Sequence, residues 1–320
     1  MTGPPGTGGS PVRHPAVSGS FYPADPVELT ELVDGLLKTA RPPDDAVTAG
    51  EAGLAGILVP HAGLVYSGHV AAVAWRLAER AWRLAEGASR LASSDVPAAG
   101  LEPTTIVLLG TNHRAGWLHG IGVWEAGTWR TPLGDVAVDE DLAAEIVALG
   151  PPFRVDRDAH RSEHSLEVQL PFVGLVLPGA RIVPLAISAG RGELAVSAGA
   201  RLGALLAERR AKGARICVAI STDMAHYPPA TVGARVTEEL APIILALEPT
   251  RLAHREAEIA DPGLRGVVCG MCGIEPTVLG LAALGAMGVA RGIRLAAATS
   301  ADVGGPSDRT VGYLAVAFPG

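Results

Sequence analysis

The chain has 320 residues, of which 48% are hydrophobic, 18% are charged and only 4% are aromatic. This length and apolar content suit one large α/β domain with a core of mainly aliphatic side chains. The net charge is −7 and the arginines are scattered, so no basic surface forms and we expect no nucleic-acid partner.

Residues 1–10 are rich in Gly, Pro and Thr and contain neither a basic segment nor an apolar run. We therefore expect them to be disordered and not to act as a secretion signal. The cysteines are too few for a disulfide framework, which indicates a reducing cytoplasm. The most apolar stretch, 267–290, contains a glutamate, a proline and several glycines, and this favours a buried helix over a membrane span.

The first helix has a clear start, because Asp25 can cap it, Pro26 suits its first turn and Glu28 follows the cap by three residues. Next come a short buried strand at 56–59 and a helix from about residue 68. That helix contains the repeat AWRLAE at 74–79 and 81–86. The following stretch, 86–103, reads as a loop or frayed helix. We therefore predict an expansion near 81–103 within one domain spanning 11–320.

The rest of the chain alternates apolar strands with helices. The predicted strands are 105–109, 181–187, 216–220, 295–298 and 313–318. The predicted helices are 139–149, 162–176, 190–209, 231–247 and 273–288. This alternation predicts a single α/β domain with a mostly parallel central sheet and helices on both faces.

Ligands of such sheets bind outside the carboxyl ends of the strands. His61 follows the strand at 56–59, and His113 follows the strand at 105–109. Each histidine alone could simply cap the next helix. Two histidines at the ends of separate strands in one sheet could instead converge on one metal or anion.

Two further polar pairs occur at predicted element boundaries. His164 and Glu167 open the helix at 162–176, and their spacing suits a metal pair, an acid/base pair or, as we favour from the spacing alone, a helix cap. Asp223 and His226 follow the strand at 216–220, where they could orient each other as a general base or support a metal. A turn with an Asx hydrogen bond is the structural alternative for that pair.

Cys272 precedes the helix that contains Pro276. A helix N-terminus lowers a cysteine pKa and favours the metal-binding thiolate, although many such cysteines are only small buried hydrophobes. Cys269 and Cys272 form a CxxC, but no second CxxC completes a four-cysteine zinc site. Neither a GxSxG elbow nor a phosphate-binding loop occurs, which disfavours a serine hydrolase and a P-loop nucleotidase.

Six segments in a fixed order carry a family resemblance. They are Ser18 to Pro23, Pro60 to Gly63 with Tyr66 to Gly68, Gly110 to His113, Glu163 to Glu167, Ser221 to Asp223 with His226, and Cys272-Gly273 with Pro276. Together they resemble the Memo-like family, the B component of the prokaryotic AmmeMemoRadiSam system. The resemblance covers about residues 12–318.

The resemblance implies a fold similar to that of the class III extradiol dioxygenases, which use non-haem iron. It also implies that His61, His113 and Cys272 bind a metal, since the spacing Cys-Gly-x-x-Pro selects Cys272 over Cys269. His164, Asp223 and His226 would then surround the metal as the catalytic residues.

A thiolate in place of the dioxygenases' carboxylate makes the site softer, which favours iron(II) or copper, with zinc as a further candidate. Three functions follow from these residues. The first is a metal-dependent oxidoreductase acting with dioxygen, with His164 or His226 as the acid/base. The second is a binding or accessory protein that docks a peptide, a small molecule, or AMMECR-like and radical SAM partner proteins. The third is a metal-dependent hydrolase.

Overall fold

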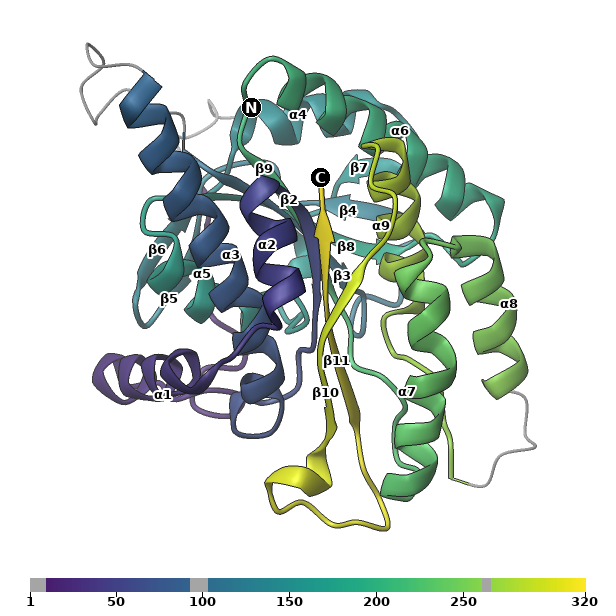
Figure 1. The fold of residues 1–320 in the computed structure, drawn as a ribbon. Helices are drawn as coiled ribbons and strands as arrows, with labels where there is room; N and C mark the ends of the chain where they lie inside the picture. The colour runs from purple at the N-terminus through teal and green to yellow at the C-terminus, as the bar shows by residue number, and fades with distance from the viewer. Residues whose placement is uncertain (1–9, 93–102, 261–265) are drawn as a thin grey trace, which may run out of the picture.

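The central sheet has eight strands within the described residues, which in this computed structural model are 10–92, 103–260 and 266–320. Their spatial order is β10-β11-β2-β9-β3-β8-β4-β7 (Figure 1). The strands are β2 (Leu54–Val59), β3 (Thr105–Thr111), β4 (Gly120–Val123), β7 (Phe153–Val155), β8 (Arg181–Ser188), β9 (Ile216–Ser221), β10 (Ile293–Thr299) and β11 (Gly312–Pro319).

The four central strands β2, β9, β3 and β8 are parallel to one another. Outside them, β10 and β11 form an antiparallel pair, β11 is antiparallel to β2, and β4 is antiparallel to β8. The sheet is therefore mixed, and the predicted parallel arrangement holds for its centre. The central strands are buried on both faces, as expected for parallel strands covered by helices.

Helices cover both faces of the sheet (Figure 1). On one side lie α1 (Pro26–Thr39), α2 (Asp44–Ala52), α3 (Leu64–Ala92) and α5 (Leu170–Val176), and on the other lie α6 (Glu193–Ala211), α7 (Ala230–Leu245), α8 (Pro249–Ala260) and α9 (Ile274–Ala286). The remaining helix, α4 (Glu140–Ala148), packs against β7 and β8. None of the described helices is long and apolar enough to cross a membrane.

A second, three-stranded sheet combines β1 (Val12–Arg13), β5 (Thr128–Thr131) and β6 (Gly134–Ala137). The sequence analysis missed it because its strands are too short to present a repeating apolar pattern. Arg13, in β1, is buried and forms an ion pair with buried Glu167. The pair connects the start of the chain to the segment that carries His164.

Several predicted boundaries change in the structure. The start of α1 is confirmed, because the Asp25 side chain accepts hydrogen bonds from Val27 N and Glu28 N. Helix α3 begins at Leu64 and continues to Ala92, so 86–92 are helical and not a loop. Residues 93–102 and 1–9, on which the other part of the predicted expansion and the predicted N-terminal disorder fall, lie outside the described residues.

The helix predicted at 162–176 starts later than expected. A short 3-10 turn, Glu167–Gln169, precedes α5, and Pro171 occupies the first turn of that helix. His164 therefore lies in a loop before the helix. The backbone of this loop bonds to the carboxylate of Glu163, whose Oε1 accepts from His164 N and Ser165 N at 2.9 Å each.

Candidate metal centre

His61 lies two residues after the end of β2 and is fixed by Ser221, the last residue of β9, and by Asp223, just beyond it. Its backbone N–H donates to Asp223 Oδ1 at 2.8 Å. Its ring Nδ1 lies 3.0 Å from the hydroxyl oxygen of Ser221. The other ring nitrogen, Nε2, lies 3.2 Å from Cys272 Sγ. The imidazole is thus anchored through Nδ1, while Nε2 points at the Cys272 thiol.

Cys272 lies in the loop that leads into α9, whose N-cap is Gly273. Its backbone N–H donates to the Asp223 carbonyl at 3.2 Å, and its Sγ accepts from Asp223 N at 3.4 Å. Gly273 packs so closely that a Cβ there would lie 2.5 Å from Thr222 Cβ. The glycine is needed for this close approach, which places the thiol beside the end of β9.

His113, after the end of β3, is oriented by buried Glu163. The Nδ1 atom of His113 lies 2.9 Å from Glu163 Oε1, and its backbone N–H donates to Glu163 Oε2 at 2.6 Å. Burial alone would raise the pKa of Glu163, but the hydrogen bond and charge of His113 and the Ser165 amide lower it to about 2. Because the Glu163 carboxylate holds Nδ1 of His113, Nε2 is the ring nitrogen left to bind a metal.

His164 completes a cluster of three imidazoles. Its ring stacks on His113 with centroids 4.6 Å apart, and its centroid is 5.5 Å from that of His61. Phe21 covers His164 at 4.8 Å between centroids. Among the described residues, the buried Nδ1 atom of His164 makes no hydrogen bond, although it lies 3.4 Å from Glu163 Oε1.

His226 lies at the other side of Asp223, with its Nε2 atom 4.0 Å from Asp223 Oδ2. That nitrogen is also buried and makes no hydrogen bond within the described chain. The structure therefore brings His226 near the cluster through Asp223. It does not place His226 in a set of potential metal ligands with the other residues.

Burial favours the neutral form of His61, His164 and His226. Burial lowers the pKa of His61 well below its usual value, and the charges of His113 and His164 lower it further. Burial likewise lowers the pKa of His164 and of His226 to about 4. A neutral imidazole has a lone pair for a metal, so the electrostatics of the site suit metal binding.

Asp223 and Cys272, unlike Glu163, are shifted toward their neutral forms. Burial raises the pKa of Asp223 to about 7, against the lowering effect of the His61 and Ala62 amides. Burial and the neighbouring Asp223 raise the pKa of Cys272 well above its usual value. The predicted lowering by a helix N-terminus is therefore wrong, since burial outweighs the dipole. A cation would be required to stabilise the thiolate.

Within the part of the chain that the structure describes, two groups of side chains are spaced to hold a metal ion, and both include His61. One comprises His61, His113 and His164, and the other comprises His61, Asp223 and Cys272, with the ligand atoms of each group within 4.8 Å of one another. Cys269 belongs to neither group. Neutral imidazoles, a carboxylate and a thiol are donors that suit a transition metal.

The orienting roles of Glu163 and Ser221 were missed by the sequence analysis, and so was the packing of Phe21 on His164. All three residues lie within the motifs quoted above, next to predicted site residues. Their partners, however, come from distant segments, such as Glu163 with His113 and Ser221 with His61. Only the folded sheet brings these segments together.

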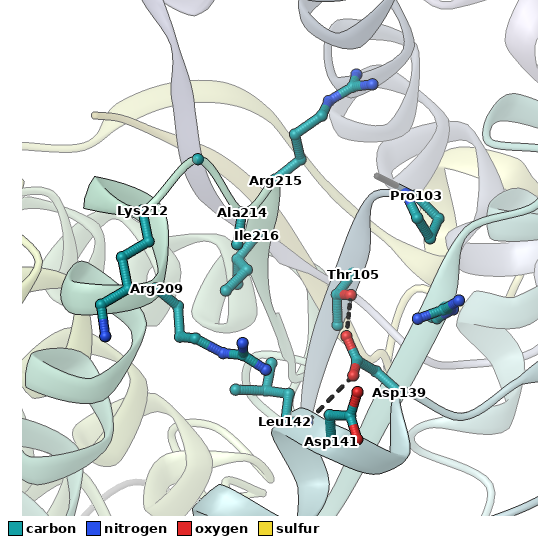
Figure 2. A pocket seen from close by; sticks show the side chains of 12 residues that line it. Pro103, Thr105, Asp139, Asp141, Leu142, Arg209, Lys212, Ala214, Arg215 and Ile216 are labelled. Atoms are coloured by element: carbon teal, nitrogen blue, oxygen red, sulfur yellow. Dashed lines mark hydrogen bonds between the residues drawn. The ribbon is translucent and has the colours of Figure 1, made fainter. Parts of the chain in front are cut away.

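A polar pocket of about 330 Å³ lies at the opposite end of the central strands from the histidine cluster, at the amino ends of β3, β8 and β9 (Figure 2). Three of its lining cations have partners in the protein: Arg209 with Glu145 at 3.1 Å, Lys212 with Glu208 at 2.6 Å, and Arg215 with the Trp82 carbonyl at 3.2 Å. This pocket is therefore separate from the histidine cluster, and its charges are largely matched internally.

Comparison with known proteins agrees with the motifs. A family model described as Memo-like protein matches residues 13–317. A MEMO1 family protein of Methanopyrus kandleri is 34% identical over 309 residues, which cover 96% of this chain and 98% of the relative. A MEMO1 family protein of Aquifex aeolicus is 32% identical over 308 residues, with 96% and 99% coverage.

One solved structure is also similar, that of an uncharacterized protein from Escherichia coli K12. It has 18% sequence identity and a TM-score of 0.43, and the match covers 73% of this chain and 91% of that protein. This likeness is too distant to support an argument about function. The match to the family model spans nearly the whole chain, and the chain belongs to the Memo-like protein family.

Proposed function

We propose that the histidine cluster is a transition-metal centre in which His61, His113 and Cys272 are the ligands. Three protein ligands leave coordination positions open, as a reactive centre needs. His164, Asp223 and His226 then surround the metal without binding it directly. This assignment gives each residue of the cluster a distinct role.

The observation that carries the proposal is the matched anchoring of two histidines. Nδ1 of His61 bonds to Ser221 and Nδ1 of His113 bonds to Glu163. Metal-binding histidines typically use one ring nitrogen for the metal and donate the other N–H to such a partner. Nε2 of His61 already lies 3.2 Å from the Cys272 thiol. His61 is common to both described donor groups, and the proposal combines it with His113 from one group and with Cys272, after loss of the thiol proton, from the other.

We infer that the metal is iron(II) or copper, with zinc as the non-redox alternative. A thiolate combined with imidazoles is a soft donor set, which disfavours magnesium and calcium. Bound at this position, iron or copper would supply the redox chemistry for a reaction with dioxygen. The function favoured by this site is therefore a metal-dependent oxidoreductase, in line with the dioxygenase-like fold expected from the family resemblance.

The surrounding residues suit proton handling. Burial lowers the pKa of His164 to about 4, so this imidazole is neutral near pH 7 and its lone pair can take up a proton transiently from a stronger acid. Asp223, with its pKa raised by burial to about 7, can hold or release one. Phe21 shields His164 on one side and helps to exclude water.

Anaerobic metal titration followed by oxygen-uptake measurement tests this function. We expect the protein loaded with iron(II) or copper(I) to consume dioxygen faster than the metal-loaded His164→Ala variant. The zinc-loaded protein is the redox-inactive control. Stoichiometric metal binding with oxygen uptake no faster than that of free metal would contradict the oxidoreductase and favour a binding role or a hydrolase.

The binding role is the second candidate. Exposed apolar side chains follow or precede residues of the cluster in sequence, namely Tyr66, Tyr227 and Val268. Exposed apolar groups beside a polar site are typical of surfaces that bind other molecules. Binding assays with AMMECR-like and radical SAM proteins, with a Tyr66→Ser and Tyr227→Ser double variant as control, test this alternative.

A further inference from the structure

Glu256 is a buried carboxylate outside the metal centre. It lies on α8 and is 0% exposed, although the helix as a whole is polar. One of its oxygens forms an ion pair with Arg191, whose side chain is partly exposed. Burying a carboxylate costs several kcal/mol before its partners compensate, so such a group calls for a reason other than stability.

The second oxygen of Glu256 points at the loop that carries both cysteines of the CxxC. Its Oε1 accepts a hydrogen bond from Gly270 N at 3.1 Å. The contact is close, because a Cβ on Gly270 would lie 3.3 Å from Glu256 Cγ and equally near Ile259 and Leu240. The carboxylate therefore fixes the loop backbone two residues before Cys272.

The opposite side of the same loop is fixed by the segment after β9. Met224 and Met271 form an isolated antiparallel bridge, and Cys272 N donates to the Asp223 carbonyl at 3.2 Å. Regular helix starts only at Ile274. The position of the Cys272 thiol thus depends on two anchors, the Asp223 segment on one side and Glu256 on the other.

We propose that Glu256 is a positioning residue for the metal centre, which sets the place of the Cys272 sulfur through Gly270. This inference rests on the proposed role of Cys272 as a metal ligand. Glu256 touches neither Cys272 nor His61 by any hydrogen bond of the described structure, so it acts through the loop. The ion pair with Arg191 orients the carboxylate.

The test uses cobalt(II) as a spectroscopic probe in the full chain. Glu256→Met removes both acceptor oxygens at similar side-chain length, and the partly exposed Arg191 can then turn to water. Glu256→Gln keeps an amide oxygen for Gly270 N. The control is Glu79→Met, which removes another mostly buried, ion-paired glutamate on α3.

We expect Glu256→Met to raise the Kd for cobalt by about 10–100-fold and to weaken the thiolate-to-cobalt charge-transfer absorption. Glu256→Gln and Glu79→Met should remain close to wild type in both respects. In the metal-free proteins, hydrogen exchange of the peptide 266–273 should be faster only in Glu256→Met. This measurement keeps the test decisive even when metal loading is incomplete.

Unchanged cobalt affinity and absorption in Glu256→Met would overturn the proposal. An equal loss in Glu79→Met would also overturn it, because the effect would then reflect general destabilisation. A wild-type protein that binds cobalt without a thiolate band would refute the role of Cys272 as ligand, and the positioning role with it. These outcomes separate a failure of the metal centre from a failure of Glu256.

Discussion

Cys272 follows His61 by 211 positions in the chain, and its Sγ atom lies 3.2 Å from Nε2 of His61. Asp223 joins the two residues. Its carboxylate accepts from the His61 backbone, while its own backbone bonds to Cys272 at both N and Sγ. One residue after β9 therefore aligns the end of β2 with the loop before α9.

Removing a neighbour of the metal should alter reactivity more than occupancy. We predict that His164→Ala and Asp223→Asn retain most of the metal when it is supplied in excess, because neither is in the proposed ligand set. Their metal affinity or oxygen-uptake rate should change by about 10–100-fold. Metal analysis and absorption spectra of the two variants check this. A folded variant that loses its metal completely would identify that residue as a ligand.

Glu163 should control how well His113 binds. Glu163→Gln replaces the carboxylate that contacts both Nδ1 and the backbone N–H of His113. We predict a loss of metal affinity of about 10–100-fold, measured by competition with a chelator. Glu125→Gln, which alters a surface ion pair with Arg157, is the control and should bind metal as wild type does. Equal affinity of both variants would argue against His113 as a ligand.

Stability should fall as the pH is lowered from about 6.5 to about 4. Burial lowers the pKa of His160 from 6.5 to about 4 in the folded protein, so the unfolded chain takes up a proton there before the folded chain does. The shift corresponds to about 3 kcal/mol of stability, present above the unfolded pKa and lost below it. Urea unfolding across this pH range measures the loss, which His160→Gln should reduce. A His160→Gln variant with an undiminished slope would assign it to other groups.

The buried ion pair between Arg13 and Glu167 should be essential for the fold around His164. Glu167 also accepts from Ala16 N at 2.8 Å and Val17 N at 3.1 Å. We predict that Glu167→Ala lowers the free energy of unfolding by about 3–5 kcal/mol, since it leaves a buried guanidinium unpaired. Glu248→Ala, at an exposed ion pair, should have little effect in the same urea titration. Similar effects of the two variants would show that burial of the pair carries no special cost.

The sequence was informative where one segment determines its own structure. Apolar runs such as 181–187 gave the central strands, and Asp25 with Pro26 gave the start of α1. Helix α8 was missed because its inward stripe of Leu252, Ala253 and Ile259 is interrupted by Glu256, a charged residue that only the folded loop explains.

For the candidate site too, the sequence could identify some residues but not the properties that depend on distant segments. His61, His113 and Asp223 could be found because each follows an apolar strand. The structure brings His61 and His113 together with His164, and His61 and Asp223 together with Cys272. The thiol pKa could not be predicted, since it depends on burial and on Asp223 from a distant segment. The same holds for the carboxylate of Glu163, whose partner His113 lies 50 positions earlier in the chain.

Metal content per chain tests the central claim most directly. The wild-type protein, metal-loaded and then dialysed, should retain about one transition-metal ion, as one three-ligand site requires. His61→Ala and Cys272→Ser should each lose most of it, while Cys269→Ser, which lies outside both donor groups, should retain it. Unchanged stoichiometry in both His61→Ala and Cys272→Ser would contradict the proposed centre.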